Sequence, residues 1–423
     1  MSSNGRNIKL LFVTHLFYPA IGGVELHIKN VSAELVKRGY EVSVLTTNAY
    51  STEAFFLGDK RRIAEPEAVV DGVRVRRLGF RTFGRWVLRK LTSVACRIKY
   101  PFNDWIRFLN FGPRNWSFIA HILASEVDVI IAAPLPTMNT YYAYKAAQRM
   151  KKPLVIIPSY HIYDPCSFYN PIFFKMMRAA ACVFTQSPLE RDYLAREAGI
   201  PNHRFVILPP LPLQESQLHL PPRDKQELRE RYGIQEKNIV LYLGQHGVHK
   251  RVSQVLEAMP HVWQVFPDTA LVIAGGITDH TKMLKKLAAE LTAKGTGKVY
   301  FIDNFPAQEK EDIFRMADIF ISLSEMESFG IVLVEALNCG LPVVASKNNV
   351  SRYIVEETQT GILVEPKCLT EVAGALIELL SDEEMRKKFS ENARQKALTV
   401  YHPQRILDAW EEFIQHVITN HHK

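Results

Sequence analysis

The chain has 423 residues, with 52 Lys and Arg against 44 Asp and Glu, a formal net charge of +8, and five cysteines. At roughly 150 residues per domain, this length predicts two or three domains, which excludes a peptide hormone and a single small binding module. With 47% hydrophobic and 23% charged residues, the composition is near the globular average and argues against long disorder, a coiled coil or a collagen-like repeat.

The cysteines are widely spaced and never form a Cys-x-x-Cys pair, so the sequence predicts neither a disulfide framework nor a metal site. The apolar run at 8–13 is too short for a secretory signal. No stretch approaches the ~20 apolar residues that cross a bilayer. The longest apolar stretch, 329–345, is interrupted by Glu335, Gly340 and Pro342. We expect a cytoplasmic protein, either soluble or attached peripherally to the inner face of the membrane.

The first half of the chain alternates short apolar strands with amphipathic helices, the pattern of open, mostly parallel sheets with helices on both faces. A strand over 8–14 leads through a glycine-containing loop to a helix over 24–37 and then to a strand over 41–46. Further strands are predicted at 127–132, 154–157, 182–185 and 205–208, with helices at 137–149 and 188–198.

A proline-rich stretch then interrupts the alternation. Its prolines cannot pair well in a central strand, which favours a stiff connection. They are Pro209, Pro210, Pro212, Pro221 and Pro222. We therefore expect a first domain over 1–212, a linker region over 213–237 and a second domain over 238–403.

After the linker the alternation of strands and helices resumes. Two doubly wound α/β domains in tandem place a cleft between the carboxyl ends of both sheets, where ligands bind in such folds. A last helix is predicted over 404–419, and one option is that the segment 404–423 packs back on the first domain. The predicted strands are 239–243, 270–274, 298–302, 319–322 and 342–345, and the predicted helices are 252–266 and one from Phe329 onward.

The positive charge is concentrated between residues 72 and 120, a basic aromatic insert with eleven basic residues, one acid and ten aromatic residues. Basic and aromatic side chains together suit an anionic membrane interface. The same composition suits single-stranded nucleic acid, and a solvated face over a packed helical insert explains it about as well. The residues proposed for a membrane face are Arg81, Arg85, Trp86, Arg89 and Lys90.

Gly22 and Gly23 stand directly before the first helix, where backbone N–H groups can approach an anion. The loop lacks a Gly-x-Gly-x-x-Gly pattern, which disfavours a dinucleotide-dependent dehydrogenase. A plain turn explains the glycine pair about as well as an anion site does. In the second half, Gly244 follows a predicted strand, and Lys250 and Arg251 stand where the next helix begins. Such a loop puts positive charge and backbone donors together, as a diphosphate requires.

The strongest motif lies over 324–344. We expect a helix to begin at Ser328 to Gly330, with free N–H groups that could hold phosphate oxygens. Glu335 would then lie about seven residues, or ~10 Å, beyond Glu327, comparable to the span of a nucleotide diphosphate from sugar to ribose. An exposed charge that stabilises the helix is the alternative for Glu327. Glu335 is embedded among apolar residues, where a carboxylate is costly unless paired.

The segment 327–335 resembles the E-x7-E signature of the retaining glycosyltransferases of family 4, which have the GT-B fold. The loops at 22–25 and 244–250 and the runs 274–276 and 340–344 extend the resemblance over nearly the whole chain. It implies transfer of a hexose from a nucleotide-diphosphate sugar to an acceptor hydroxyl, with retained configuration and no obligatory metal or other cofactor. It also implies an acceptor on the first domain, for which a lipid-linked or cell-envelope glycan is one option, and a donor on the second.

Residue by residue, the resemblance assigns Gly23 and Lys250 to the diphosphate, Glu327 to the transferred sugar and Glu335 to the ribose. His161 matches a histidine common in the family, although a structural histidine is an equal alternative. The base would lie near Asn304 and Phe305. The catalytic candidates are Glu327, Lys250 and His161, and the donor-binding candidates are Gly23, Gly244, Gln245, Lys250, Arg251, Gly275, Asn304, Phe305, Glu327, Ser328, Phe329, Gly330, Ile331 and Glu335.

Three departures from the family pattern matter. Gln245 replaces the usual Arg and removes a cation, for which Arg251 or His246 could compensate. The run 131–134 lacks the His-x-His pattern of many members, and Pro209-Pro210 replaces the usual Asn-Gly pair before the linker.

Two other functions stay open. One is a nucleotide-sugar hydrolase or epimerase on the same scaffold. The other is a non-catalytic nucleic-acid-binding protein that uses residues 72–120, but this alternative gives the motif at 327–335 no role. No nucleic-acid partner is expected, and the oligomeric state is not predicted.

Overall fold

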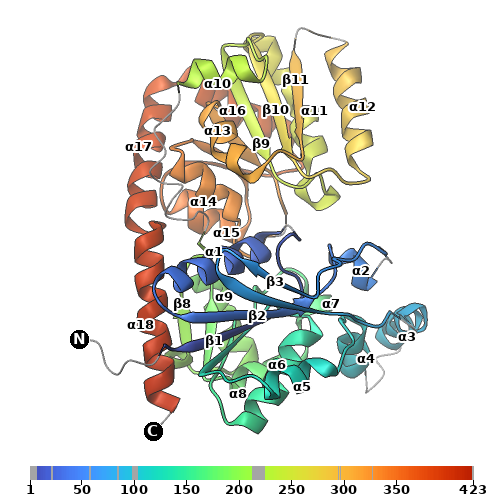
Figure 1. The fold of residues 1–423 in the computed structure, drawn as a ribbon. Coiled ribbons are helices and arrows are strands. Elements are labelled where there is room, and N and C mark those ends of the chain that lie inside the picture. The colour runs from blue at the N-terminus through green and yellow to red at the C-terminus, as the bar shows by residue number, and fades with distance from the viewer. Residues whose placement is uncertain are drawn as a thin grey trace. The chain divides into compact units, whose positions relative to one another are not determined.

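The chain folds into two compact units, each built around one sheet (Figure 1). In this computed structural model the described residues are 7–20, 22–56, 59–82, 85–97, 103–211, 224–293, 295, 297–325 and 327–421. Unit 1 comprises Met1–Gln214 with Pro403–Lys423, and unit 2 comprises Glu215–His402. Residues 213–223 of the expected linker lie outside the described residues.

The sheet of unit 1 has the strand order β3-β4-β2-β1-β5-β6-β7-β8, and its neighbouring strands are parallel except for the antiparallel pair β3 and β4. The strands are β1 (Lys9–Thr14), β2 (Glu41–Thr47), β3 (Glu67–Val70), β4 (Val73–Leu78), β5 (Val129–Ala133), β6 (Leu154–Ile156), β7 (Cys182–Thr185) and β8 (Phe205–Ile207). The helices are α1 (Gly23–Lys37), α2 (Glu53–Phe56), α3 (Arg85–Arg97), α4 (Asn103–Asn110), α5 (Ser117–Leu123), α6 (Met138–Met150), α7 (Pro165–Phe168), α8 (Pro171–Ala179), α9 (Pro188–Ala198), η1 (Asn202–Arg204) and α18 (Pro403–His421).

Helices cover both faces of this sheet because alternate residues of its strands point to opposite sides. On β1, Leu10 and Phe12 join the apolar cluster formed with α1 and α18, whereas Leu11 and Val13 join the cluster formed with α5 and α6. Trp410 of α18 is fully buried in the first cluster, and its ring stacks on that of Phe184 with 4.6 Å between centroids. The C-terminal helix is therefore part of the core of unit 1.

The sheet of unit 2 is entirely parallel in the order β11-β10-β9-β12-β13-β14. Its strands are β9 (Asn238–Leu243), β10 (Thr269–Gly275), β11 (Lys298–Asp303), β12 (Ile319–Ser322), β13 (Val343–Ser346) and β14 (Gly361–Val364). Its helices are α10 (Lys225–Arg231), η3 (Val248–Lys250), α11 (Val252–Val265), α12 (Thr281–Thr292), η4 (Ala307–Glu309), α13 (Lys310–Arg315), α14 (Ile331–Asn338), α15 (Asn349–Ser351), η5 (Arg352–Glu356), α16 (Leu369–Ser381) and α17 (Glu383–Thr399).

The predicted fold class, two doubly wound α/β domains, is confirmed in both units, and every predicted strand forms. Two local predictions need correction. The helix expected from Ser328 begins at Ile331, because Gly330 adopts the left-handed conformation with φ of 80° directly before it. The basic segment 72–120 is not all insert, since its first residues form β4 of the main sheet.

In the described part of the chain, no helix combines the length and the apolar character that a bilayer span needs.

We expect Trp410→Ala to lower the free energy of unfolding of unit 1 by about 3–5 kcal/mol, because it leaves a large cavity between α18 and the sheet. Urea denaturation followed by far-UV circular dichroism measures this loss. Glu412→Ala, at an exposed position of the same helix, should change stability by less than about 0.5 kcal/mol. Equal losses in the two variants would show that α18 does not stabilise unit 1 through its buried face.

Candidate functional site

The predicted donor residues of unit 2 gather where the order of its strands reverses, between β9 and β12. In open parallel sheets, loops at such a point diverge and leave room for a ligand at the carboxyl ends of the strands. The loop after β9 carries Lys250 and the loop after β12 carries Glu327. Lys250 Nζ lies 2.5 Å from Glu327 Oε1, and both side chains are about four-fifths buried. Two candidate catalytic residues that are 77 positions apart in sequence are thus ion-paired.

A second ion pair lies beside the first. Arg251 Nη2 donates to Glu325 Oε1 at 2.6 Å, and Lys367 Nζ lies 3.7 Å from the same oxygen. The hydrogen bond from Arg251 lowers the pKa of Glu325. The backbone N–H of Glu325 also donates to the carbonyl of His249, which ties the two loops together. The cations near the predicted diphosphate position are therefore neutralised by carboxylates of the chain itself.

From the sequence alone, His246 or Arg251 could supply the positive charge that is lost because Gln245 stands in place of an Arg. The structure does not support this expectation. His246 is fully buried, its Nδ1 lies 3.1 Å from the Thr281 hydroxyl, and burial lowers its pKa. Arg251 is engaged by Glu325. Neither residue therefore presents an unpaired cation in place of the Arg.

Glycines let the loops at the carboxyl edge of the sheet of unit 2 approach one another closely. Gly275, at the end of β10, has φ of 144°, and a Cβ there would lie 1.8 Å from the carbonyl oxygen of Gly244. The carbonyl of Gly275 accepts from the backbone N–H of Asn304, and Asn304 Oδ1 accepts from that of Ile277 at 3.3 Å. Gly244, Gly275 and Asn304 thus lie at one edge of the sheet, while Phe305 packs partly buried against the core.

Glu335 lies within α14, and only 2% of it is exposed. Its Oε1 accepts from Lys310 Nζ at 2.5 Å, whereas its Oε2 has no partner among the described residues. Burial raises the pKa of Glu335, and the nearby Lys310 acts against that rise. The expected helical span of ~10 Å between Glu327 and Glu335 does not apply, because Glu327 precedes the helix.

At the start of α14, no side chain of a described residue caps the free backbone N–H groups. Phe329, by contrast, is buried, and the centroid of its ring lies 6.4 Å from that of the Tyr401 ring. Ser328 is half-buried before the left-handed Gly330. The amide of Ile331 is thus available to an anion, whereas the Phe329 side chain belongs to the core.

In unit 1, Gly22 caps α1 and Gly23 is its first residue. They lie beside the point where the strand order reverses, here between β1 and β5. Sequence reasoning missed two buried residues of this loop. Glu25 Oε1 lies 3.4 Å from His15 Nε2, and burial raises the pKa of Glu25 to about 7 while lowering that of His15 to about 3. Glu25 Oε2 occupies the space that a Cβ at residue 22 would need. A Glu at the third helical position after a glycine could have signalled this contact.

His161 lies beyond the end of β6, in the segment that follows Pro158. Its imidazole is half-buried, with 5.0 Å between its centroid and that of Phe168. It thus lies at the carboxyl edge of the sheet of unit 1.

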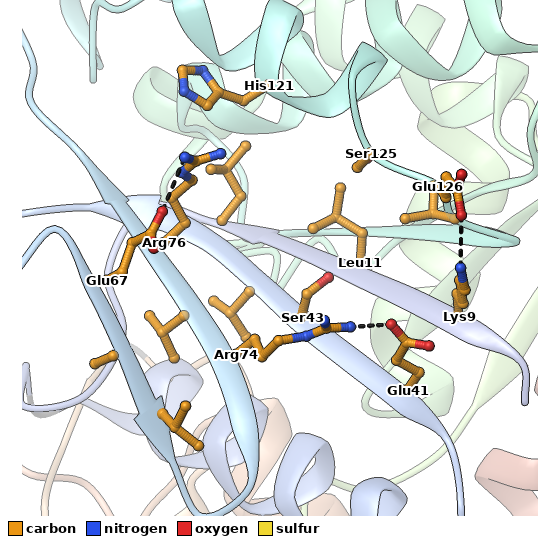
Figure 2. A pocket seen from close by; sticks show the side chains of 16 residues that line it. Lys9, Leu11, Glu41, Ser43, Glu67, Arg74, Arg76, His121, Ser125 and Glu126 are labelled. Atoms are coloured by element: carbon orange, nitrogen blue, oxygen red, sulfur yellow. Dashed lines mark hydrogen bonds and ion pairs between the residues drawn. The ribbon is translucent and has the colours of Figure 1, made fainter.

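A cavity of about 740 Å³ lies on the sheet face of unit 1, over β1, β2, β3 and β4 and beside α5 (Figure 2). Its charged side chains pair with one another: Arg74 with Glu41, Arg76 with Glu67, and Lys9 with Glu126. The described residues that line it include none of the predicted site residues. This cavity therefore does not bear on the donor site.

The proposed membrane face is centred on α3. Trp86 is 67% exposed, and Lys90 Nζ lies 3.8 Å from the centroid of its indole. Val87, Leu91 and Val94 are about half exposed and follow helical spacing on one side. The side chains of Arg85 and Arg89 lie outside the described residues. Arg81 is exposed, and its backbone N–H donates to the carbonyl of Arg114.

Two protein families match this chain. Residues 22–210 match the family described as "Glycosyl transferase 4-like domain", and residues 224–396 match "Glycosyl transferases group 1".

Similar proteins include the alpha-D-kanosaminyltransferase of Streptomyces kanamyceticus, with 30% identity over 51% of this chain and 55% of that protein, so the match spans about half of its length. The GDP-mannose-dependent alpha-(1-6)-phosphatidylinositol monomannoside mannosyltransferase of Mycolicibacterium smegmatis is 26% identical over 88% of this chain and 89% of that protein. The crystal structure of Anabaena HepE with UDP and glucose has a TM-score of 0.70 at 19% identity, covering 97% of this chain and all of that one. This last likeness shows the two-domain fold.

We expect Gly275→Ala to destabilise unit 2 by about 2–3 kcal/mol, because the new Cβ collides with the Gly244 carbonyl and requires a left-handed conformation. Differential scanning calorimetry measures the change. Gly276→Ala is the matched control, since its Cβ would lie 3.5 Å from Gln245 Cγ, an ordinary contact. If both variants melted like the parent, the close approach of the two loops would be refuted.

Proposed function

The chain belongs to the family 4-type glycosyltransferases with the GT-B fold, and from this premise we propose that it is a retaining, metal-independent hexosyltransferase. The donor is a nucleotide-diphosphate sugar, which unit 2 binds, and the acceptor is a hydroxyl compound, which unit 1 binds. The observation that carries the proposal is the ion pair of Lys250 and Glu327 at the point where the strand order of unit 2 reverses.

In the proposed reaction, the bond between the anomeric carbon and the diphosphate breaks while a bond to the acceptor oxygen forms on the same face of the sugar. The proton of the acceptor hydroxyl passes to the departing phosphate oxygen. Negative charge grows on that phosphate, where Lys250 and the amides before α14 stabilise it. One fixed donor of this kind contributes ~3 kcal/mol to transition-state stabilisation. No protein nucleophile and no metal are assigned.

The ion pair gives each partner a role when the donor binds. Without a donor, Lys250 is ion-paired with Glu327. A diphosphate that takes Lys250 releases Glu327, whose carboxylate then accepts hydrogen bonds from sugar hydroxyls. Glu335 keeps one oxygen for the ribose, because Lys310 engages only the other. The remaining proposed donor contacts in unit 2 are the backbones at Gly244, Gly275 and Gly330, and the base of the donor would lie near Asn304.

We also propose that unit 1 works at an anionic membrane on the cytoplasmic side and takes a lipid-linked or envelope glycan acceptor. The exposed side of α3 supports this, since Trp86, Val87 and Leu91 can enter the interface while Lys90 meets headgroups. The Mycolicibacterium relative is named for a phosphatidylinositol mannoside acceptor.

We expect Lys250→Ala and Glu327→Gln each to reduce turnover at least tenfold while the fold survives, because each removes a group that acts on the diphosphate or on the sugar. The measurement is release of UDP from UDP-glucose, or of GDP from GDP-mannose, in the presence of EDTA with a lipid extract as acceptor. Lys286→Ala, at an exposed lysine of α12, should match the parent. Near-normal turnover in both site variants would remove the assignment.

The same assay distinguishes the alternatives. Consumption of donor at an equal rate without any acceptor would favour a hydrolase or epimerase over a transferase. Loss of activity in EDTA, restored by a divalent cation, would contradict the metal-independent mechanism. The anomeric configuration of the product, read by NMR, tests retention directly.

We expect the double variant Trp86→Ser/Leu91→Ser to bind anionic vesicles at least fivefold less than the parent, because it loses the apolar side chains that enter the interface. Flotation with phosphatidylcholine vesicles containing phosphatidylglycerol at low salt measures binding. Leu398→Ser, at a comparably exposed leucine of α17, is the control. A parent protein that leaves these vesicles unbound ends the membrane proposal, and steeply salt-dependent oligonucleotide binding would favour the nucleic-acid alternative.

A further inference from the structure

Glu190 of unit 1 lies at a helix start but does not bond as its sequence context predicts. Ser187 precedes α9, and its hydroxyl accepts from the backbone N–H of Glu190 at 3.2 Å. In such a Ser-x-x-Glu capping box, the glutamate normally accepts from the N–H of the capping serine. Here Glu190 Oε2 accepts instead from the N–H of Gln186 at 2.7 Å, and Oε1 accepts from the N–H of Tyr160 at 2.8 Å.

The bond to Tyr160 is a long-range one, spanning 30 residues. It joins the start of α9 to the segment after β6, which is a different loop of the same sheet edge. Glu190 is only 2% exposed. A buried carboxylate is costly unless hydrogen-bonded, so the two amides account for its presence there.

The segment that Glu190 holds contains a strained residue. Ser159 has φ of 48°, in the left-handed region that residues other than glycine seldom adopt, and it is buried. Such a conformation is unfavourable and persists only where the surrounding structure fixes it. Tyr160, whose backbone N–H donates to the Glu190 carboxylate, directly follows Ser159. His161 comes directly after Tyr160.

We propose that Glu190 is a positioning residue, which fixes the backbone of Ser159 to His161 and thereby holds the His161 imidazole for the transfer reaction. This inference rests on the proposed function and adds a residue that acts through another. Burial raises the pKa of Glu190 to about 7, while the two backbone N–H groups favour its ionised form.

The test uses Glu190→Gln in the full-length protein. A glutamine oxygen can accept only one of the two N–H groups, and its amide nitrogen faces the other, so the link to one loop is lost. Hydrogen exchange read by mass spectrometry should show the peptide over 157–163 exchanging at least tenfold faster. Asp192→Asn, at an exposed carboxylate of the same helix that pairs with Arg191, should leave exchange unchanged.

A kinetic cycle with His161→Ala then tests whether the link serves the reaction. With UDP-glucose or GDP-mannose, whichever the parent turns over, Glu190→Gln should lower kcat at least tenfold with KM for the donor within twofold. In the His161→Ala background, the same substitution should change kcat less than twofold. Should the glutamine variant fail to fold, Glu190→Asp, which keeps the charge but shortens its reach, takes its place.

Independent, multiplying losses in the cycle would overturn the proposal, since Glu190 would not act through His161. Full activity of His161→Ala would overturn it too, while leaving transfer by Lys250 and Glu327 intact. Unchanged exchange over 157–163 in both Glu190→Gln and Glu190→Asp overturns the link itself, whatever the activity. A parent that turns over no nucleotide sugar instead refutes the proposed function, and the exchange experiment still decides whether Glu190 holds the segment.

Discussion

The ion pair of Lys250 and Glu327 is the contact on which the rest of the candidate site depends. It joins the loops after β9 and β12, which leave neighbouring strands in opposite directions along the sheet. A lysine so close to a glutamate is stable without any ligand, yet a diphosphate carries more charge than one carboxylate and can displace it. In the proposed function, Glu327 therefore neutralises Lys250 until a donor binds. The approach of Gly275 to Gly244 brings a third loop to the same edge.

Other buried carboxylates near the carboxyl edges of the two sheets also have partners, although not all of these are cations. Glu335 is paired with Lys310, Glu25 lies against His15, and Glu190 accepts from two backbone amides. A carboxylate withdrawn from water needs such partners, because burying it without them costs a large part of the free energy of folding. Each therefore fixes a loop or a helix that begins where a strand ends.

Sequence patterns predicted the strands well because runs such as β9 and β10 are apolar on both faces, which only a buried parallel strand requires. They failed on β4, where arginines alternate with valines and raise the polarity of a true strand. They also placed the start of α14 too early, since the left-handed Gly330 ends the preceding loop. Long-range partners such as Lys310, 25 residues before Glu335, leave no periodic signal in one sequence.

The basic character of residues 72–120 acquires a different meaning once the charges are placed. Arg74 and Arg76 form surface ion pairs with Glu41 and Glu67, and the buried Arg77 donates to backbone carbonyls. These cations are largely neutralised or turned inward, so they add little to a field that attracts an anionic surface. Among the described side chains of α3, the exposed Trp86, Val87, Leu91 and Val94 form an apolar stripe with Lys90 beside it. In the membrane proposal, binding would therefore rest partly on insertion of this apolar stripe and not on charge alone. Salt screens the attraction between charges but not the apolar insertion, so binding would weaken less steeply with salt.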